Sequence, residues 1–224
     1  MGLDWKPMNK PHNGFEDEYE RIFKILTGEV KQNISLINKL KGKRELSQEE
    51  LLERFLSIST TAYETLNAPQ VGLNEAATKW AEDKFESQED KSLTLEEFMN
   101  QMNGYYVLDL VPECDGLPMY ITMHDEAHVF RAEFLNDCQE IIGKELHDEA
   151  YESKLAHETK NYANRLMEVA KKYANDNNCP ELINIRKPPQ SDEDSPESKA
   201  HILFSAGKWL KYWSEKGHGM EADF

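Results

Sequence analysis

Apolar residues recur every three or four positions along most of this 224-residue chain. Tyr19, Ile22 and Leu26 show the pattern, which places side chains on one face of an α-helix. Large β-sheets draw on β-branched residues, but the chain has six valines and eight threonines, too few for such a sheet. The sequence therefore predicts a mainly α-helical fold.

Capping residues mark the starts of several helices. Ser47 and Thr94 are each followed three residues later by a glutamate, which is the pattern of a capping box. Asn74 is a good N-cap residue, and Ser195 precedes a proline in the first helical position. These signals and the apolar spacing predict helices at residues 15–26, 30–42, 47–66, 74–85, 94–104, 125–142, 144–175 and 196–216.

Residues 105–123 have a different pattern. The stretch Tyr105–Val111 is apolar and rich in strand-forming residues, and Leu117–Met123 is a suitable partner strand. The segment between them contains prolines and an Asp-Gly pair, which favour a turn. We expect one small β-hairpin at about residues 105–123, lying against helices because two isolated strands are marginally stable in water.

The length of the chain and the composition of its loops predict a single helical domain over residues 1–224. Residues 1–14 contain two prolines and are expected to form an extended N-terminal arm. Residues 176–196 are polar and rich in proline, so we expect a linker-like loop before a C-terminal helix at 196–216. That helix is expected to pack into the core through Ile202, Leu203, Trp209 and Trp213. The tail from residue 218 is expected to fray.

The chain is strongly acidic, with 42 Asp and Glu residues against 26 Lys and Arg residues and a net charge of −16. A surface of that sign repels nucleic-acid phosphates and anionic lipids, so direct binding to either is not expected. The excess begins at residue 61: residues 1–60 are neutral, whereas residues 61–123 carry twelve acids against three bases. We therefore expect an acidic face around residues 61–123 and 144–158.

Cysteine usage and hydropathy predict a cytoplasmic location. No stretch approaches 18 apolar residues, and the first residues lack the apolar core of a signal peptide. Cys114, Cys138 and Cys179 are widely spaced and form no Cys-x-x-Cys pair, so a disulfide framework is not expected. These observations predict a reducing compartment and no association with a membrane.

His124 and His128 are the best candidates for a metal site. Four residues apart on a helix, they lie on one face, at a spacing that lets two imidazoles hold one metal ion. Asp125 is a further candidate ligand, and Glu126 is placed to orient a water molecule. The alternative is a pair of surface histidines at a helix start, where the two acids complement the helix dipole. A divalent metal is the one cofactor that the sequence suggests.

A second candidate site surrounds the predicted hairpin. Asp109 interrupts an apolar strand, and a buried carboxylate requires a partner such as Arg131. The first interpretation is an internal ion pair that holds the hairpin against a helix. The second is a small-ligand pocket beneath the hairpin, lined by Asp109, Asp115, Tyr120, Arg131 and Tyr151.

Three stretches resemble a group of bacterial cytosolic proteins. They are MGLDWKPMNKPHNGFE at the start, GYYVLDLVPECDGLPMY in the middle, and VFRAEFLNDCQEIIG with EAYESKL soon after it. That group is uncharacterised and has no assigned activity. The resemblance implies a bacterial or phage-related cytosolic origin, and it carries no catalytic residue to this chain.

The sequence contains neither a Gly-x-Ser-x-Gly motif nor a glycine motif for dinucleotides, so the function it favours is binding rather than catalysis. The preferred hypothesis is a non-enzymatic, acidic helical protein that binds a basic protein or a nucleic-acid-binding protein. Two alternatives stay open: a metal-dependent hydrolase that uses His124 and His128, and a small-ligand binder beneath the hairpin.

Overall fold

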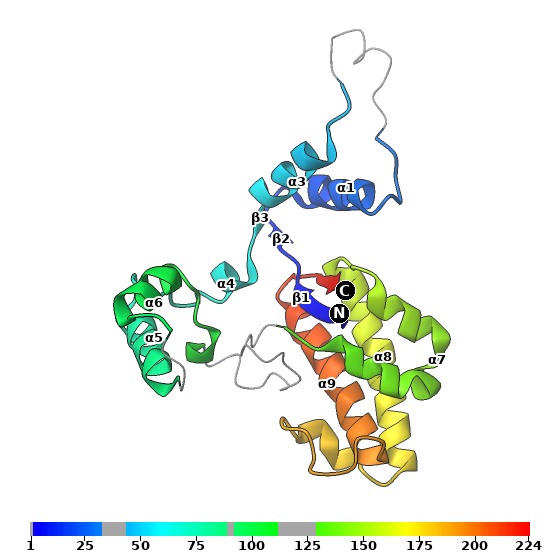
Figure 1. Cartoon of the computed structure of the whole chain (residues 1–224). Helices are drawn as coiled ribbons and strands as arrows, with labels where there is room; N and C mark the ends of the chain where they lie inside the picture. Colours follow the sequence, from blue (N-terminus) through cyan, green and yellow to red (C-terminus); the bar gives the residue numbers. More distant parts are fainter. Residues whose placement is uncertain (1, 33–43, 89–91, 112–128) are drawn as a thin grey trace. The chain divides into compact units, whose positions relative to one another are not determined.

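The computed structural model describes residues 2–32, 44–88, 92–111 and 129–224 (Figure 1). The chain divides into two compact units. The large unit consists of Met1–Met8 and Tyr63–Phe224, and the small unit consists of Asn9–Ala62. The single domain expected over the whole chain stays a prediction, and each unit is described by itself.

Helices dominate the described residues, which confirms the mainly α-helical prediction (Figure 1). The α-helices are α1 (Glu16–Leu26), α3 (Gln48–Ser57), α4 (Ala62–Thr65), α5 (Glu75–Ser87), α6 (Leu95–Met102), α7 (Gln139–Asp148), α8 (Ala156–Asp176) and α9 (Pro196–Glu215). The 3₁₀ helices are η1 (Leu108–Leu110), η3 (Ala132–Cys138), η4 (Glu149–Tyr151) and η5 (Pro180–Asn184). The strands are β1 (Asp4–Pro7), β2 (Lys10–Pro11), β3 (Ser59–Thr60) and β4 (Met220–Asp223). None of these described helices has an apolar stretch of the length required to cross a membrane.

The capping residues begin helices where the sequence predicted them. The side chains of Ser47 and Thr94 accept the backbone N–H of the residue three positions later, and both capping boxes are complete. Asn74 caps α5 by accepting from two backbone N–H groups, and Ser195 caps α9 ahead of a proline. These interactions are local, so the sequence alone is enough to place them.

Helices α8 and α9 form the centre of the large unit and lie side by side (Figure 1). A Cβ atom at Gly207 of α9 would come within 2.5 Å of the Sδ atom of Met167 on α8. The missing side chain therefore lets the two helices approach closely. Trp209 and Trp213 of α9 are fully buried, which confirms the packing role expected for them.

The two ends of the chain meet in the large unit, where β1 pairs antiparallel with β4. Trp5 is fully buried there, and its indole N–H donates to the carbonyl of Ala150 at 2.8 Å. On its other edge β4 is fixed by Met220, whose backbone pairs with Lys154. The prediction that the tail frays is wrong, because residues 220–223 form a strand with a neighbour on each side.

The first strand of the hairpin predicted at 105–123 is not a continuous strand in the structure. Small antiparallel pairs are present, but they are β1–β4 and β2–β3. Within the predicted first strand, Tyr106 forms a single bridge with Gln70, and Leu108–Leu110 make a 3₁₀ turn instead of extended backbone. Residues 112–123, which include the predicted partner strand, lie outside the described residues.

The helix predicted over 144–175 is two helices. It is interrupted between η4 and α8, where Lys154 adopts an extended conformation and pairs with Met220 of β4. A backbone that donates and accepts across a bridge is unavailable for helical hydrogen bonds at that point. The interruption also places the Lys154 side chain inside the large unit, where it is 9% exposed.

The helix predicted over 125–142 begins later than expected. Residues 125–128 lie outside the described residues, and Phe130 is extended because its backbone exchanges hydrogen bonds with Trp5 at 2.8 and 3.0 Å. The chain then enters η3 and α7, which join at Cys138–Gln139. Gly143 interrupts α7 with a φ of 77°, a conformation that glycine adopts without strain.

The small unit packs α1 against α3. The rings of Tyr19 and Phe55 stack with centroids 4.1 Å apart, and Arg54 donates two hydrogen bonds to Glu18. The helix predicted over 47–66 ends at Ser57. The next residue, Ile58, is buried, and β3 begins directly after it. Most of the helix predicted over 30–42 lies outside the described residues.

Candidate functional site

Most of the residues predicted from sequence to form a site lie outside the part of the chain that the structure describes. They are Asp115, Tyr120, His124, Asp125 and His128. The metal site proposed on the His124–His128 pair therefore stays a prediction. Among the described residues, no group of three or more His, Cys, Asp or Glu side chains has the geometry of a metal site.

Asp109 and Arg131 are described, and each has a partner other than the one predicted. The ion pairs of Arg131 are with Asp4, at 3.5 Å, and with Glu133, at 2.8 Å. Asp109 is exposed and accepts a hydrogen bond from the indole N–H of Trp80 at 3.3 Å. The predicted Asp109–Arg131 ion pair is wrong, because the extended backbone before η3 brings Arg131 to β1 instead.

Tyr151, the last predicted ligand-binding residue, has a packing role in η4. Its hydroxyl donates to Asn136 Oδ1 at 3.2 Å, and its ring packs edge-on against Phe224 with centroids 5.6 Å apart. His147 also bonds to Asn136, at 2.8 Å. The ring contact attaches the C-terminal residue to η4, and the two hydrogen bonds attach η4 and α7 to η3.

The described residues that stand out as a surface lie on α5 and on the segment after α6. We call Trp80, Asp83, Lys84, Tyr105 and Asp109 the acidic–aromatic surface. The apolar side of α5 packs into a small core made by Val71, Ala77, Ala81 and Val107, with Trp80 at its partly buried edge. This core positions the indole, so that part of the ring stays accessible at the surface.

The contacts of Trp80 define the surface. The ring of Tyr105 stacks parallel to the indole, with centroids 6.1 Å apart and an interplanar angle of 6°. The ammonium of Lys84, one helical turn after Trp80, lies over the indole at 5.3 Å from the ring centroid. Asp109 holds the indole N–H. The indole is therefore fixed in orientation and already contacts a positive charge.

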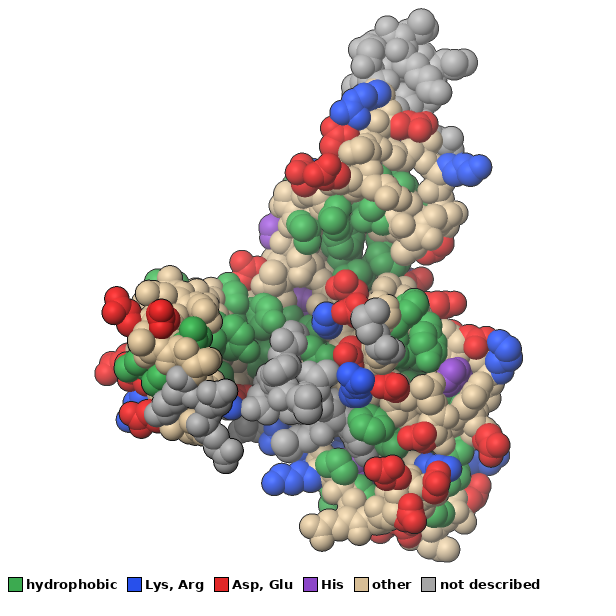
Figure 2. All heavy atoms as spheres, viewed as in Figure 1, with side chains coloured by type: hydrophobic (Ala, Val, Ile, Leu, Met, Phe, Trp, Pro, Cys, Tyr) green, Lys and Arg blue, Asp and Glu red, His purple; other side chains and the backbone are tan. Residues whose placement is uncertain are grey.

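The charge around this surface is strongly negative. The described residues of the segment 61–111 include eight Asp and Glu side chains against two Lys side chains. Asp83 lies one helical turn from Trp80, and Glu75, Glu82 and Glu86 are exposed on the same helix. Figure 2 shows acidic side chains across this part of the molecule, with hydrophobic side chains between them. Such a surface attracts cations from a distance, and a cation that displaces Lys84 meets the aromatic face of Trp80.

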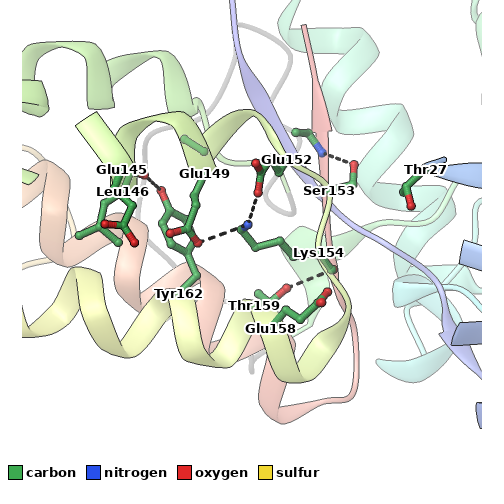
Figure 3. Close-up of polar contacts among 12 residues, drawn as sticks. Thr27, Glu145, Leu146, Glu149, Glu152, Ser153, Lys154, Glu158, Thr159 and Tyr162 are labelled. Atoms are coloured by element: carbon green, nitrogen blue, oxygen red, sulfur yellow. Dashed lines mark hydrogen bonds and ion pairs between the residues drawn. The ribbon is translucent and has the colours of Figure 1, made fainter. Parts of the chain in front are cut away.

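A second polar cluster lies inside the large unit, beside α8 (Figure 3). Lys154 binds Glu152 at 2.9 Å and Glu149 at 3.4 Å, and its ammonium lies 5.5 Å from the ring centroid of Tyr162. Arg165 donates to Glu149 with both terminal nitrogens. The Tyr162 hydroxyl is fully buried and donates to the Leu146 carbonyl at 2.8 Å, and burial raises its pKa. Every polar group in this cluster is satisfied by its neighbours, so the arrangement stabilises the fold and offers no reactive group.

Glu149 makes the stability of the large unit depend on pH. Burial raises the pKa of this carboxyl group, but the hydrogen bonds from Arg165 and the charge of Lys154 outweigh burial, so the pKa lies below its ordinary value of 4.5. A carboxylate with a lowered pKa stabilises the fold above its unfolded pKa and loses that contribution as the pH falls through its folded pKa. We expect Glu149→Gln to be less stable than the wild type at pH 7 and the gap to shrink below about pH 4.5. Urea denaturation from pH 7 to pH 3 measures the gap.

Asp4 provides a control, because its pKa is shifted in the opposite direction to that of Glu149. Burial raises the pKa of Asp4, and the charges of Arg131 and Lys6 only partly offset it. The contribution of Asp4 to stability therefore falls as the pH rises and the carboxyl group ionises, and Asp4→Asn is expected to gain relative to the wild type between pH 3 and pH 7. A gap for Glu149→Gln that stays constant with pH contradicts the role given to this ion pair.

Comparisons with known proteins assign no function to the site, so its function is inferred from its own chemistry. No family model, curated protein or solved structure matches this chain. On the acidic–aromatic surface, the accessible acids and aromatic rings indicate a positively charged partner. The sequence contained a signal for it: Trp80 and Lys84 are four residues apart, the helical spacing at which a cation reaches an aromatic ring. Tyr105 and Asp109 join them only in the folded chain.

Proposed function

We propose that the chain is a non-enzymatic binding protein whose acidic–aromatic surface takes a basic segment of a protein partner. The observation that carries the proposal is the ammonium of Lys84 over the indole of Trp80. This contact supports the proposal because the ring already binds the kind of group that a partner's lysine or arginine presents. Nucleic-acid-binding proteins are one class of such partner, since their phosphate-binding surfaces are rich in these residues.

The energetics favour a moderate, salt-dependent interaction. A cation over an aromatic ring contributes about 0.5–2 kcal/mol, depending on how far it is desolvated. The acids around Trp80 add long-range attraction, which raises the association rate and weakens as salt screens it. The proposed interaction therefore combines steering by acids with an anchor at Trp80.

The first test measures the contribution of the ring. The probe is a fluorescein-labelled nonapeptide with the sequence Arg-Arg-Leu repeated three times, and anisotropy reports its binding at low salt. We expect Trp80→Ala to weaken binding about 5- to 30-fold, as the loss of one cation–π anchor predicts. Trp80→Phe keeps an aromatic face and is expected to retain most of the affinity. Equal affinity in Trp80→Ala and the wild type contradicts the proposal.

The second test separates local charge from total charge. One triple variant removes Glu82, Asp83 and Glu86 by amide substitution, and a matched variant replaces Glu168, Glu181 and Glu193 with glutamine. All six side chains are exposed, so both variants lose three negative charges without disturbing the core. We expect the first variant to bind the peptide at least about tenfold more weakly and the matched variant to change little. Equal weakening in both variants would show attraction to net charge alone.

A further inference from the structure

A pocket of about 470 Å³ opens on the large unit between η3, α7, α8 and the start of α9. Its lining residues are Asp137, Glu140, Ile141, Val169, Lys172, Tyr173, Asp176 and Lys199. The volume falls within the range of pockets that hold small molecules. None of these residues belongs to the acidic–aromatic surface, so binding in this pocket does not depend on the proposed function.

The half-buried residues of the pocket combine apolar surface with two polar groups. Ile141, Val169 and Tyr173 are half-buried and supply aliphatic and aromatic surface. Lys199 is also half-buried, and its ion pair with Asp194 is long, at 3.6 Å, to a side chain that is 92% exposed. A cation held this loosely is available to a stronger anionic partner.

Tyr173 and Lys199 act on the same region of the pocket. Burial raises the pKa of Tyr173, and the nearby charge of Lys199 acts in the opposite direction. The phenol therefore stays protonated at neutral pH and is able to donate a hydrogen bond. Together the two residues offer an ammonium and a hydroxyl donor, which is a suitable pair for a carboxylate.

The rim of the pocket has the opposite character. Asp137, Glu140 and Asp176 are exposed there, and Lys172 lies among them. Three carboxylates repel a dianion or a phosphate, but they stabilise a positively charged group on a ligand. The half-buried part of the lining therefore carries a positive charge, whereas the exposed rim is mostly negative.

We infer that this pocket binds a small zwitterion, an amino acid with an apolar side chain. The carboxylate of the ligand contacts Lys199 and Tyr173, and its ammonium faces the rim carboxylates. The side chain lies on Ile141 and Val169. No covalent step is involved, and the site functions in binding.

The test uses isothermal titration calorimetry with three compounds of nearly equal shape. L-phenylalanine carries both charges, 3-phenylpropionate lacks the ammonium, and phenethylamine lacks the carboxylate. We expect phenylalanine to bind in the millimolar range or tighter and each analogue to bind at least about tenfold more weakly. Absence of phenylalanine binding, or equal binding of either analogue, overturns the inference.

Two variants connect binding to the pocket. Lys199→Met keeps the aliphatic stem but removes the charge, and it is expected to weaken phenylalanine binding about tenfold or more. Tyr173→Phe keeps the ring and removes only the hydroxyl, with an expected loss of about threefold to tenfold. Glu168→Gln, on the exposed face of α8, is the control and is expected to bind like the wild type. Unchanged affinity in Tyr173→Phe and Lys199→Met places binding elsewhere and contradicts the inference.

Discussion

Replacing Trp5 with alanine is expected to lower the free energy of unfolding by about 3–5 kcal/mol. Trp5 is fully buried, stacks on Phe130 at 5.3 Å and contacts Trp209 at 6.0 Å. Its loss opens a cavity at the centre of the large unit and leaves the Ala150 carbonyl without its indole donor. Urea denaturation followed by circular dichroism measures the change.

Trp80→Ala is the matched control for this prediction. The substitution is identical, but Trp80 is half-buried at the edge of a small core, so less apolar area and fewer contacts are lost. We expect a loss of about 1–2 kcal/mol there, well below that at Trp5. A similar loss at both positions, or a loss below about 1 kcal/mol at Trp5, contradicts the central packing role of the N-terminal strand.

The second large effect concerns the buried ion pairs. Glu149→Ala is expected to cost about 3 kcal/mol, because it leaves the ammonium of Lys154 in a buried position with one exposed partner, Glu152. Lys154→Met alone is expected to cost about 2–3 kcal/mol, since it removes the Glu149 and Glu152 ion pairs but keeps a side chain of similar length.

A double-mutant cycle measures the coupling energy between Glu149 and Lys154 apart from their interactions with other residues. We expect Glu149→Ala combined with Lys154→Met to be less destabilised than the sum of the single variants, by about 1–2 kcal/mol, because no buried charge is then left unpaired. Additive effects would show that the two side chains stabilise the fold independently. A matched surface pair, Lys144 with Asp148, is exposed and expected to couple by less than about 0.5 kcal/mol.

The starts of the capped helices were predictable because each depends on residues within four positions. The capping boxes at Ser47 and Thr94 and the cap at Asn74 close their hydrogen bonds inside one turn. The apolar spacing of α9 likewise identified Trp209 and Trp213 as core residues. Local hydrogen bonds and helical periodicity depend only on residues that are close in the sequence, so they can be predicted without the tertiary structure.

Where the sequence prediction differs from the structure, a distant partner is the reason. The tail becomes β4 because β1 supplies its neighbour, and Lys6 and Asp223, which form an ion pair, are 217 positions apart. The long helix predicted over 144–175 is interrupted because Lys154 bridges to that same strand. Four-residue strands carry little signal of their own, and their hydrogen bonds depend on what the fold brings beside them.

The sequence by itself determined a helical, acidic protein, the positions of most helix starts and the apolar faces that are buried. The tertiary structure alone decided that the two ends of the chain pair, that Asp109 binds Trp80 rather than Arg131, and that Tyr105 stacks on the same indole. The physical reason is the distance along the sequence over which each property is set. Helical propensity, capping and net charge are properties of neighbouring residues or of simple sums, whereas a binding surface is made by side chains that only the folded chain brings together.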